Sequence, residues 1–186
     1  MSFILKSMNN SSFIHPLIAS IAPLSVGGLT KEQLNSIRKY ILNTNEKSEE
    51  HKFYKRLNSY LRTGEVSKDE QTLFNIHANR LSNAIKKFKL DNDVLCYRGV
   101  DNDVYKGCEL GKVFTDKSFV STSINTSTLK NHKYWCIIVV RKGSRGAFLG
   151  TDGVSHFPKQ REFLLDKDNK FRVIGRENNI TYLEVM

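Results

Sequence analysis

The chain has 186 residues, a length that suits one domain with one hydrophobic core and requires neither disulfides nor a metal to fold. Hydrophobic residues make up 39% and charged residues 26%, as in ordinary soluble proteins, and no apolar run approaches the roughly 20 residues of a membrane span. Lysine and arginine number 29 against 19 acids, a formal charge of +10. This excess favours an anionic partner, but charge alone does not choose among nucleotides, nucleic acids, acidic proteins and lipid surfaces, and a basic surface with no dedicated partner is the other interpretation.

The first residues contain an apolar stretch that resembles a signal peptide only superficially. His15, Pro16 and Pro23 interrupt it, and Lys6 is the only basic residue before it. A helix or arm that packs on the domain is the favoured interpretation. We expect the protein to act in the cytosol, of its own cell or of a target cell, and the secretion route stays open.

Helical signals follow. Thr30 and Gln33 form a capping-box pattern, which predicts a helix over about 31–42. A second short helix begins around Phe53 and ends near Gly64.

The longest predicted helix starts after a second capping-box pattern, Ser67 with Glu70, and carries one apolar stripe as far as Phe88. His77 lies on that stripe without an acidic or metal-ligating neighbour at helical spacing. We interpret it as a core histidine.

From residue 94 onward the pattern changes to short β-type runs, and the segments "DKDN" and "ENN" are interpreted as hairpin turns. Helices first and strands afterwards predict an α+β fold with an antiparallel or mixed sheet. We expect a single domain over 1–186, helical to about residue 90 and β from 91 to 186. The strand-like runs are 94–100, 112–124, 134–142, 146–150, 162–177 and 180–186.

The cysteines do not indicate a structural framework. Cys96, Cys108 and Cys136 are odd in number and lack metal-ligand spacing, and two of them lie in apolar runs. We expect reduced thiols and no metal, which is compatible with a cytosolic protein.

Three short motifs lie in order along the β half: "YRG" at 97–99, "STS" at 121–123 and "QRE" at 160–162. Each is weak by itself. Together they supply a guanidinium fork for phosphate, short hydroxyls on one strand face, and a carboxylate. A dinucleotide whose glycosidic bond breaks needs such a set.

The third motif carries an amide and a carboxylate two residues apart. In an extended segment, Gln160 and Glu162 would project to the same side, at the mouth of the apolar strand that follows. One amide and one carboxylate would then face one ligand.

The order Arg, then Ser-Thr-Ser, then Gln-x-Glu resembles the mono-ADP-ribosyltransferase toxins of the arginine-serine-glutamate class. The resemblance extends over about 80–175 and includes the first helix. Within the class it is nearest to the small single-domain Rho-modifying bacterial exoenzymes, where an aromatic residue stands three positions before the glutamine, as Phe157 does before Gln160. The resemblance implies an α+β fold of the ADP-ribosyltransferase type, with N-terminal helices followed by a mixed, mainly antiparallel β-sandwich core.

The resemblance implies NAD+ as co-substrate and no metal. It assigns the catalytic roles to Glu162, which would bind the ribose 2′-hydroxyl and stabilise the oxocarbenium-like transition state, to Ser121, which would orient Glu162, and to Gln160. The acceptor side would be held by Gln160 and contacted by Phe157. The NAD site would consist of Arg98 for the phosphate, with Gly99, Ser121, Thr122 and Ser123.

One segment departs from the class. Its Rho-modifying members carry an aromatic residue and an arginine that grip NAD in the loop after Ser-Thr-Ser. The loop of this chain, 124–134, offers Lys130, His132, Lys133 and Tyr134 instead.

The acceptor is predicted from the neutral Gln160. A guanidinium must lose a proton to attack, which a carboxylate assists, whereas an amide is suited to bind another amide. We therefore expect a macromolecular acceptor, a protein side-chain amide such as an asparagine of a small GTPase, modified by a monomeric toxin or effector. An immunity or antitoxin partner is compatible with that role. Two alternatives stay open: ADP-ribosylation of RNA or DNA by the same site, and a non-catalytic basic module that binds phosphate or nucleic acid.

Overall fold

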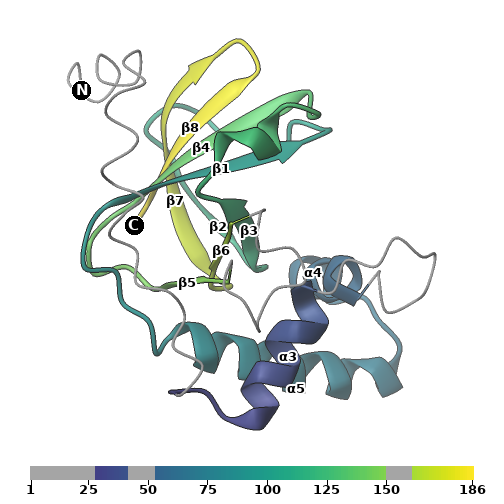
Figure 1. The fold of residues 1–186 in the computed structure, drawn as a ribbon. Helices are drawn as coiled ribbons and strands as arrows, with labels where there is room; N and C mark the ends of the chain where they lie inside the picture. The colour runs from purple at the N-terminus through teal and green to yellow at the C-terminus, as the bar shows by residue number, and fades with distance from the viewer. Residues whose placement is uncertain (1–27, 42–52, 150–160) are drawn as a thin grey trace.

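The computed structural model describes residues 28–41, 53–149 and 161–186. In Figure 1 the helices lie together at one end of the strands. They are α3 (Lys31–Ile41), α4 (Phe53–Thr63) and α5 (Lys68–Ile85), with a short 3-10 helix, η3 (Thr126–Leu129). The strands are β1 (Val94–Val100), β2 (Val113–Asp116), β3 (Val120–Ser123), β4 (Tyr134–Val140), β5 (Gly146–Phe148), β6 (Glu162–Leu165), β7 (Asn169–Glu177) and β8 (Ile180–Val185). In the described part of the chain, no helix combines the length and the apolar composition needed to cross a bilayer.

Local signals set the helix ends. The capping box before α3 is confirmed: the Thr30 amide donates to Gln33 Oε1 (3.0 Å), and the Gln33 amide donates to Thr30 Oγ1 (3.2 Å). Helix α4 ends at Thr63, and the next residue, Gly64, has a φ of 76°, a left-handed conformation that glycine adopts without a steric penalty.

The capping box predicted before α5 does not form. The Ser67 hydroxyl donates to Glu70 Oε2 (3.1 Å) and makes no bond to a backbone amide of the helix. The helix nevertheless starts at the predicted place, and His77 is a core residue as expected. It is 9% exposed, lies 3.0 Å from the Ser36 hydroxyl of α3, and has a pKa that burial lowers.

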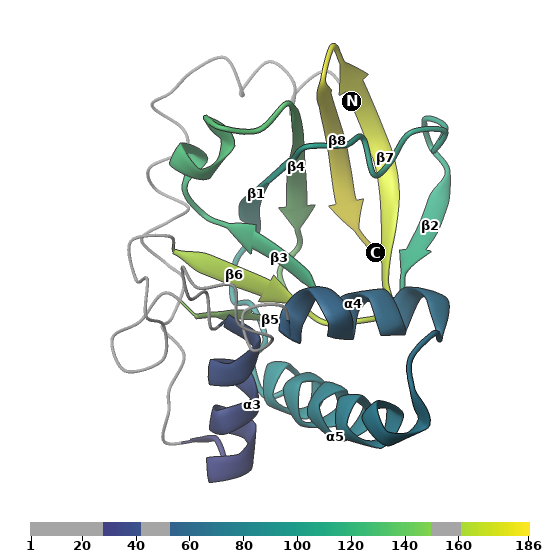
Figure 2. The same ribbon diagram turned by 90° about the vertical axis from the view of Figure 1, so that its right-hand side faces the viewer.

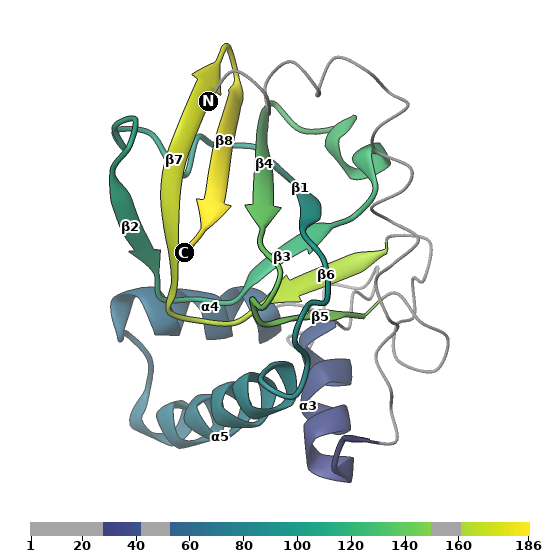
Figure 3. The same cartoon turned by 90° about the vertical axis from the view of Figure 1, so that its left-hand side faces the viewer.

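The described strands form one sheet in the order β2-β7-β8-β4-β1-β3-β6-β5. Every neighbouring pair is antiparallel except β4 with β8, which is parallel. The two halves of the sheet join where β1 meets β3 through a single register pair, Tyr97 with Ser123. Figures 2 and 3 show β6 and β5 running across the direction of β4, β8 and β7. The predicted α+β class with a mixed, mainly antiparallel sheet is confirmed.

One predicted hairpin is correct and the other is wrong. The "ENN" turn, with Asn178 at φ 52°, joins the paired strands β7 and β8. The "DKDN" turn, with Asp168 at φ 59°, joins β6 to β7, which do not pair with each other. Both are genuine turns, but the second carries the chain from one half of the sheet to the other.

Strand β6 is apolar after its first residue because both of its faces are buried. Leu164 packs in a core shared with the three helices, which also includes Phe119 and Ala147. Phe163 and Leu165 pack in a second core between the strands. The strand that starts at Glu162 is therefore held from two sides.

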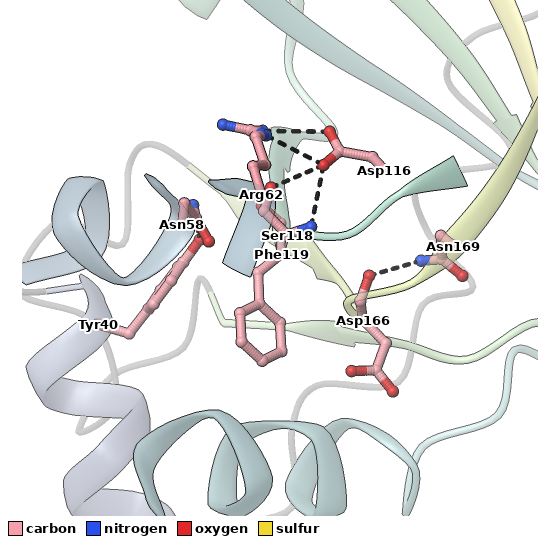
Figure 4. A network of polar contacts seen from close by, with 8 residues as sticks. All are labelled: Tyr40, Asn58, Arg62, Asp116, Ser118, Phe119, Asp166 and Asn169. Atoms are coloured by element: carbon pink, nitrogen blue, oxygen red, sulfur yellow. Dashed lines mark hydrogen bonds and ion pairs between the residues drawn. The ribbon is translucent and has the colours of Figure 1, made fainter. Parts of the chain in front are cut away.

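The far end of β6 is tied to α5 by a buried hydrogen bond. The Ser82 hydroxyl donates to Asp166 Oδ2 (2.9 Å), and the Asn169 side chain donates to the Asp166 carbonyl oxygen (2.9 Å). Figure 4 shows Asp166 and Asn169 at this turn. Burial raises the pKa of the Asp166 carboxyl, against the lowering effect of the Ser82 bond.

This raised pKa makes the stability of the fold pH-dependent. The folded state holds the Asp166 proton more tightly than the unfolded chain does, so the contribution is complete below the unfolded pKa of about 3.9 and is lost as pH rises through the folded pKa. Relative to Asp166→Asn, which does not titrate, the wild type should lose unfolding free energy as the pH rises from about 4 through the raised pKa of the folded state. Urea unfolding of both proteins across this range measures the difference, and Ser82→Ala should enlarge it. A difference that is the same at every pH would contradict the assignment.

Candidate functional site

Residues of the first two sequence motifs and Glu162 of the third meet at one cleft of about 140 Å³. The sheet register brings them together, because β3 pairs with β1 through Tyr97 and Ser123 and with β6 through Ser123 and Glu162. The middle motif therefore lies between the other two. The cleft is lined by Tyr97, Arg98, Gly99, Ser121, Thr122, Ser123, His132 and Glu162.

A short hydrogen bond connects two of the predicted catalytic residues. The Ser121 hydroxyl donates to Glu162 Oε1 (2.6 Å). Ser121 and Ser123 project from the same face of β3, and Ser123 is opposite Glu162, so the bond runs diagonally across neighbouring strands. Burial raises the pKa of Glu162, and the Ser121 bond opposes this by stabilising the carboxylate.

The other two hydroxyls of the Ser-Thr-Ser motif also have structural bonds. Thr122 Oγ1 donates to the Phe163 carbonyl oxygen (2.6 Å), which adds to the pairing of β3 with β6. Ser123 Oγ accepts from the Asn125 amide (2.9 Å) and fixes the exit of the chain from β3. Thr122 and Ser123 also line the cleft, so they contribute to its shape as well as to the hydrogen bonds that fix β3.

Arg98 is a half-buried cation beside these hydroxyls. Within the part of the chain that the structure describes, no carboxylate forms an ion pair or hydrogen bond with it. Its charge reaches two buried phenols: burial raises the pKa of Tyr40 and of Tyr105, and Arg98 acts in the opposite direction on both. A planar donor fork that no described carboxylate occupies is available to an anionic ligand.

A second arginine, Arg62 of α4, was not predicted from the sequence. It acts on the same two phenols as Arg98. Its guanidinium binds both Asp116 oxygens (3.2 and 3.1 Å), and Figure 4 shows the pair with Ser118. Burial would raise the pKa of Asp116, but its bonds to Arg62 and Ser118 outweigh burial and hold the pKa below its usual value.

Arg62 lines a second and larger pocket of about 310 Å³. The hydroxyl of Tyr105, also in its lining, is buried and has no hydrogen-bond partner among the described residues. Because the charge of Arg98 also acts on Tyr105, Arg98 lies near both pockets. The rest of the lining is Val104, Cys108, Phe114, Thr115, Asp116 and Lys117.

His132 is a further residue of the cleft, and the sequence named it only among four residues of the loop 124–134 without giving it a role of its own. It belongs to the loop between η3 and β4, and its ring lies against Gly99 of β1. No pattern in the sequence separates Arg62 or His132 from ordinary surface residues. Their place in the site depends on how the helices and the loop pack.

The remaining predicted residues, Phe157 and Gln160, lie outside the described residues. The premise that Gln160 and Glu162 stand in one extended segment does not hold, because Arg161 between them has a φ of 47°. Strand β6 begins only at Glu162. A residue in the left-handed conformation interrupts the alternation of side chains along an extended strand. The rule that residues two apart point to the same side therefore does not apply to Gln160 and Glu162.

The described residues contain no group of three or more histidine, cysteine, aspartate or glutamate side chains arranged to hold a metal ion. All three cysteines are free thiols. Burial raises the pKa of the thiols of Cys96 and Cys136 to about 12, so they are inert packing groups at neutral pH.

Comparison with known proteins gives consistent results. The profile of the ADP-ribosyltransferase exoenzyme family matches residues 23–185. The chain is 35% identical over 159 residues to the NAD(+)--arginine ADP-ribosyltransferase EFV of Enterococcus faecalis, a match that covers 80% of this chain and 30% of that protein. The chain therefore spans less than a third of the length of this relative.

Solved structures share the fold at lower identity. Plx2a, an ADP-ribosyltransferase toxin from Paenibacillus larvae, superposes with a TM-score of 0.68 at 19% identity, covering 86% of this chain and 88% of the toxin. The C3 exoenzyme of Clostridium limosum gives a TM-score of 0.66 at 16% identity, covering 85% of this chain and 86% of that enzyme.

The hydrogen bond between Ser121 and Glu162 can be tested directly. Ser121→Ala removes a donor that favours the carboxylate, so the pKa of Glu162 should rise further above its usual value. Carbon-13 NMR titration of the glutamate carboxyls measures it. Ser127→Ala, on the exposed side of η3, is the matched control and should leave this pKa unchanged. An unaltered Glu162 titration in Ser121→Ala would contradict the bond.

Proposed function

We propose that this chain, which belongs to the ADP-ribosyltransferase exoenzyme family, uses the cleft to transfer ADP-ribose from NAD+ to a macromolecular acceptor, as a toxin or effector. The observation that carries the proposal is the Ser121 to Glu162 hydrogen bond, located inside a cleft that Arg98 also lines. A carboxylate oriented by a hydroxyl, beside a guanidinium that no described carboxylate neutralises, is suited to a dinucleotide whose glycosidic bond breaks.

The donor groups of the cleft fit NAD+. Arg98 offers a bidentate fork to the pyrophosphate. The cleft of about 140 Å³ is close to the cavity of about 150 Å³ known to hold a benzene ring, so the nicotinamide ring fits it. The larger pocket, with Arg62 in its wall, offers space for the adenosine end. When bound, NAD+ supplies an already cationic leaving group.

Glu162 provides charge stabilisation rather than a covalent step. Its carboxylate is held by Ser121 in a partly dehydrated site, where a fixed negative charge opposes the positive charge that develops on the ribose. A single preorganised group of this kind lowers the barrier by about 3 to 4 kcal/mol. Burial raises the pKa of Glu162, and the Ser121 bond opposes that shift, so the bond favours the ionised form that the proposed chemistry uses.

The proposed acceptor is a protein side-chain amide, with an asparagine of a small GTPase as the leading candidate. The argument is the neutral Gln160 two residues before Glu162, which offers an amide where a proton acceptor would assist a guanidinium. A second candidate is arginine, because the enterococcal relative at 35% identity carries that acceptor in its name. The charge of +10 also favours a nucleic-acid acceptor, and a non-catalytic phosphate-binding module is the alternative without chemistry.

We propose that residues 1–186 act as one catalytic domain, as a monomer, in the cytosol of its own or a target cell. An immunity or antitoxin protein that covers the cleft would be expected for a toxin that acts in the cytosol. Pull-down of the Glu162→Gln protein from the producing cell would recover such a partner.

Replacing the carboxylate tests the catalytic assignment. Glu162→Gln keeps the shape but removes the charge, so both NAD hydrolysis and transfer should fall by about 100- to 1,000-fold while NAD affinity and thermal stability stay nearly constant. Nicotinamide release measures turnover, and calorimetry measures affinity. Arg98→Lys is the contrast: a point charge does not reproduce the fork, so NAD binding should weaken. Full turnover in purified Glu162→Gln would refute the assignment.

Gln160 tests the acceptor. Glu162 acts on NAD in every turnover, whereas Gln160 is proposed to act on the acceptor alone. Gln160→Ala should therefore keep hydrolysis within a few-fold and lose transfer by roughly 100-fold, the scale of a misplaced reactant.

The measurement is paired rates of nicotinamide release with and without acceptor, with labelled NAD and cell extract, followed by protease or nuclease treatment of the label. Gln160→Glu should introduce a trace of arginine modification, measured with agmatine. Equal loss of both rates in Gln160→Ala would place the glutamine in the NAD site. Loss of neither rate, with label removed by nuclease, would favour nucleic acid as acceptor.

A further inference from the structure

One wall of the cleft comes from His132, a residue outside the three motifs. Its backbone is fixed at both sides: its amide donates to the Leu129 carbonyl oxygen (3.0 Å), and its own carbonyl oxygen accepts from the indole of Trp135 (3.0 Å). The loop therefore presents this side chain in a defined position, between the end of η3 and the start of β4.

The ring is also fixed by its contacts. His132 Nδ1 lies 2.9 Å from Asp101 Oδ1. On the other side the ring lies on Gly99, where an added Cβ would overlap His132 Cδ2 and come within 2.6 Å of its Cγ. The backbone of Gly99 does not have a positive φ, so its conformation does not require glycine. Its lack of a side chain creates the space that the imidazole fills.

The bond to Asp101 determines what the ring offers to a ligand. An ionised carboxylate only accepts, so the shared hydrogen belongs to Nδ1. In the neutral ring, Nε2 then carries a lone pair and accepts a hydrogen bond. Within the described residues Nε2 has no partner. The nicotinamide carboxamide and the ribose hydroxyls are donors that suit it, whereas the pyrophosphate accepts only and suits Arg98.

We propose that His132 binds the nicotinamide-ribose half of NAD+ through Nε2, and that Asp101 is the positioning residue that orients its ring. The inference rests on the proposed function and extends it to the loop 124–134, which offers neither an arginine nor a second aromatic besides Tyr134. In a cleft of about 140 Å³, a ring-sized ligand touches both the wall that carries Glu162 and the wall that His132 supplies.

Two isosteres separate this role from a structural one. The terminal amide of glutamine reaches the position of Nε2, whereas that of asparagine reaches the position of Nδ1. If the contact with NAD matters, His132→Gln should keep most of the affinity and His132→Asn should behave like His132→Ala, which should bind NAD about 3- to 10-fold more weakly, the size of one net hydrogen bond. Ser127→Ala, an exposed and uncharged residue of the same loop, is the matched control and should bind as the wild type does.

Affinity is measured by calorimetry in the Glu162→Gln background, where NAD is not consumed, and KM and kcat for NAD hydrolysis are measured in the active protein. The change should lie mainly in KM. A double-mutant cycle tests Asp101: Asp101→Ala should weaken binding when His132 is present and have no effect in His132→Ala.

The outcomes are distinct. Unchanged NAD affinity in His132→Ala overturns the proposal, as does rescue by asparagine but not by glutamine, which would make the bond to Asp101 structural. An equal effect of Asp101→Ala in both backgrounds overturns the orienting role of Asp101. If the wild type itself neither binds nor hydrolyses NAD, the proposed function fails, and this inference fails with it.

Discussion

Strand β3 pairs with two different strands at once, and the site depends on that pairing. It has only four residues, yet it pairs with β1 through Ser123 and with β6 along its whole length. The guanidinium of one strand and the carboxylate of the other are more than sixty positions apart in sequence, 98 against 162. Side chains of β3 close the distance between them, and the Ser121 hydroxyl bonds the carboxylate directly.

This arrangement carries an electrostatic cost that the fold offsets locally. A glutamate with few water contacts favours its neutral form, which would remove the charge that the proposed chemistry uses. The hydroxyl of Ser121 donates a hydrogen bond to the Glu162 carboxylate and so stabilises its charged form, which an apolar residue at that position would not do. The rigidity comes from elsewhere: the residues after Glu162 are buried on both faces of β6, and Asp166 at its end is bonded to α5.

The helices therefore do more than cover the sheet. Through Tyr40, Arg62 and the core around Leu164 they reach the same region as the strand motifs. Arg62 is held by Asp116 at the end of β2 and lines the larger pocket. A ligand that occupies both pockets would touch elements from each half of the sheet and from a helix, which gives such a ligand a direct influence on how the halves are held together.

Local chemistry in the sequence was sufficient for the element types and the order of the site motifs. Capping residues and apolar periodicity placed the starts of α3, α4 and α5 within a residue or two, since these signals act over one or two helical turns.

The pairing of strands was not readable, because register depends on contacts between residues far apart in sequence. The turn at 166–169 therefore looked like a hairpin although β6 and β7 do not pair. The left-handed conformation of Arg161 was not readable either. Its φ of 47° breaks the extended geometry that the spacing of Gln160 and Glu162 suggested. The order of residues along the chain specifies which groups are available: a guanidinium, three hydroxyls and a carboxylate. Arg62 and His132 join these groups because a helix and a loop pack against the sheet, and such packing leaves no pattern in the chain.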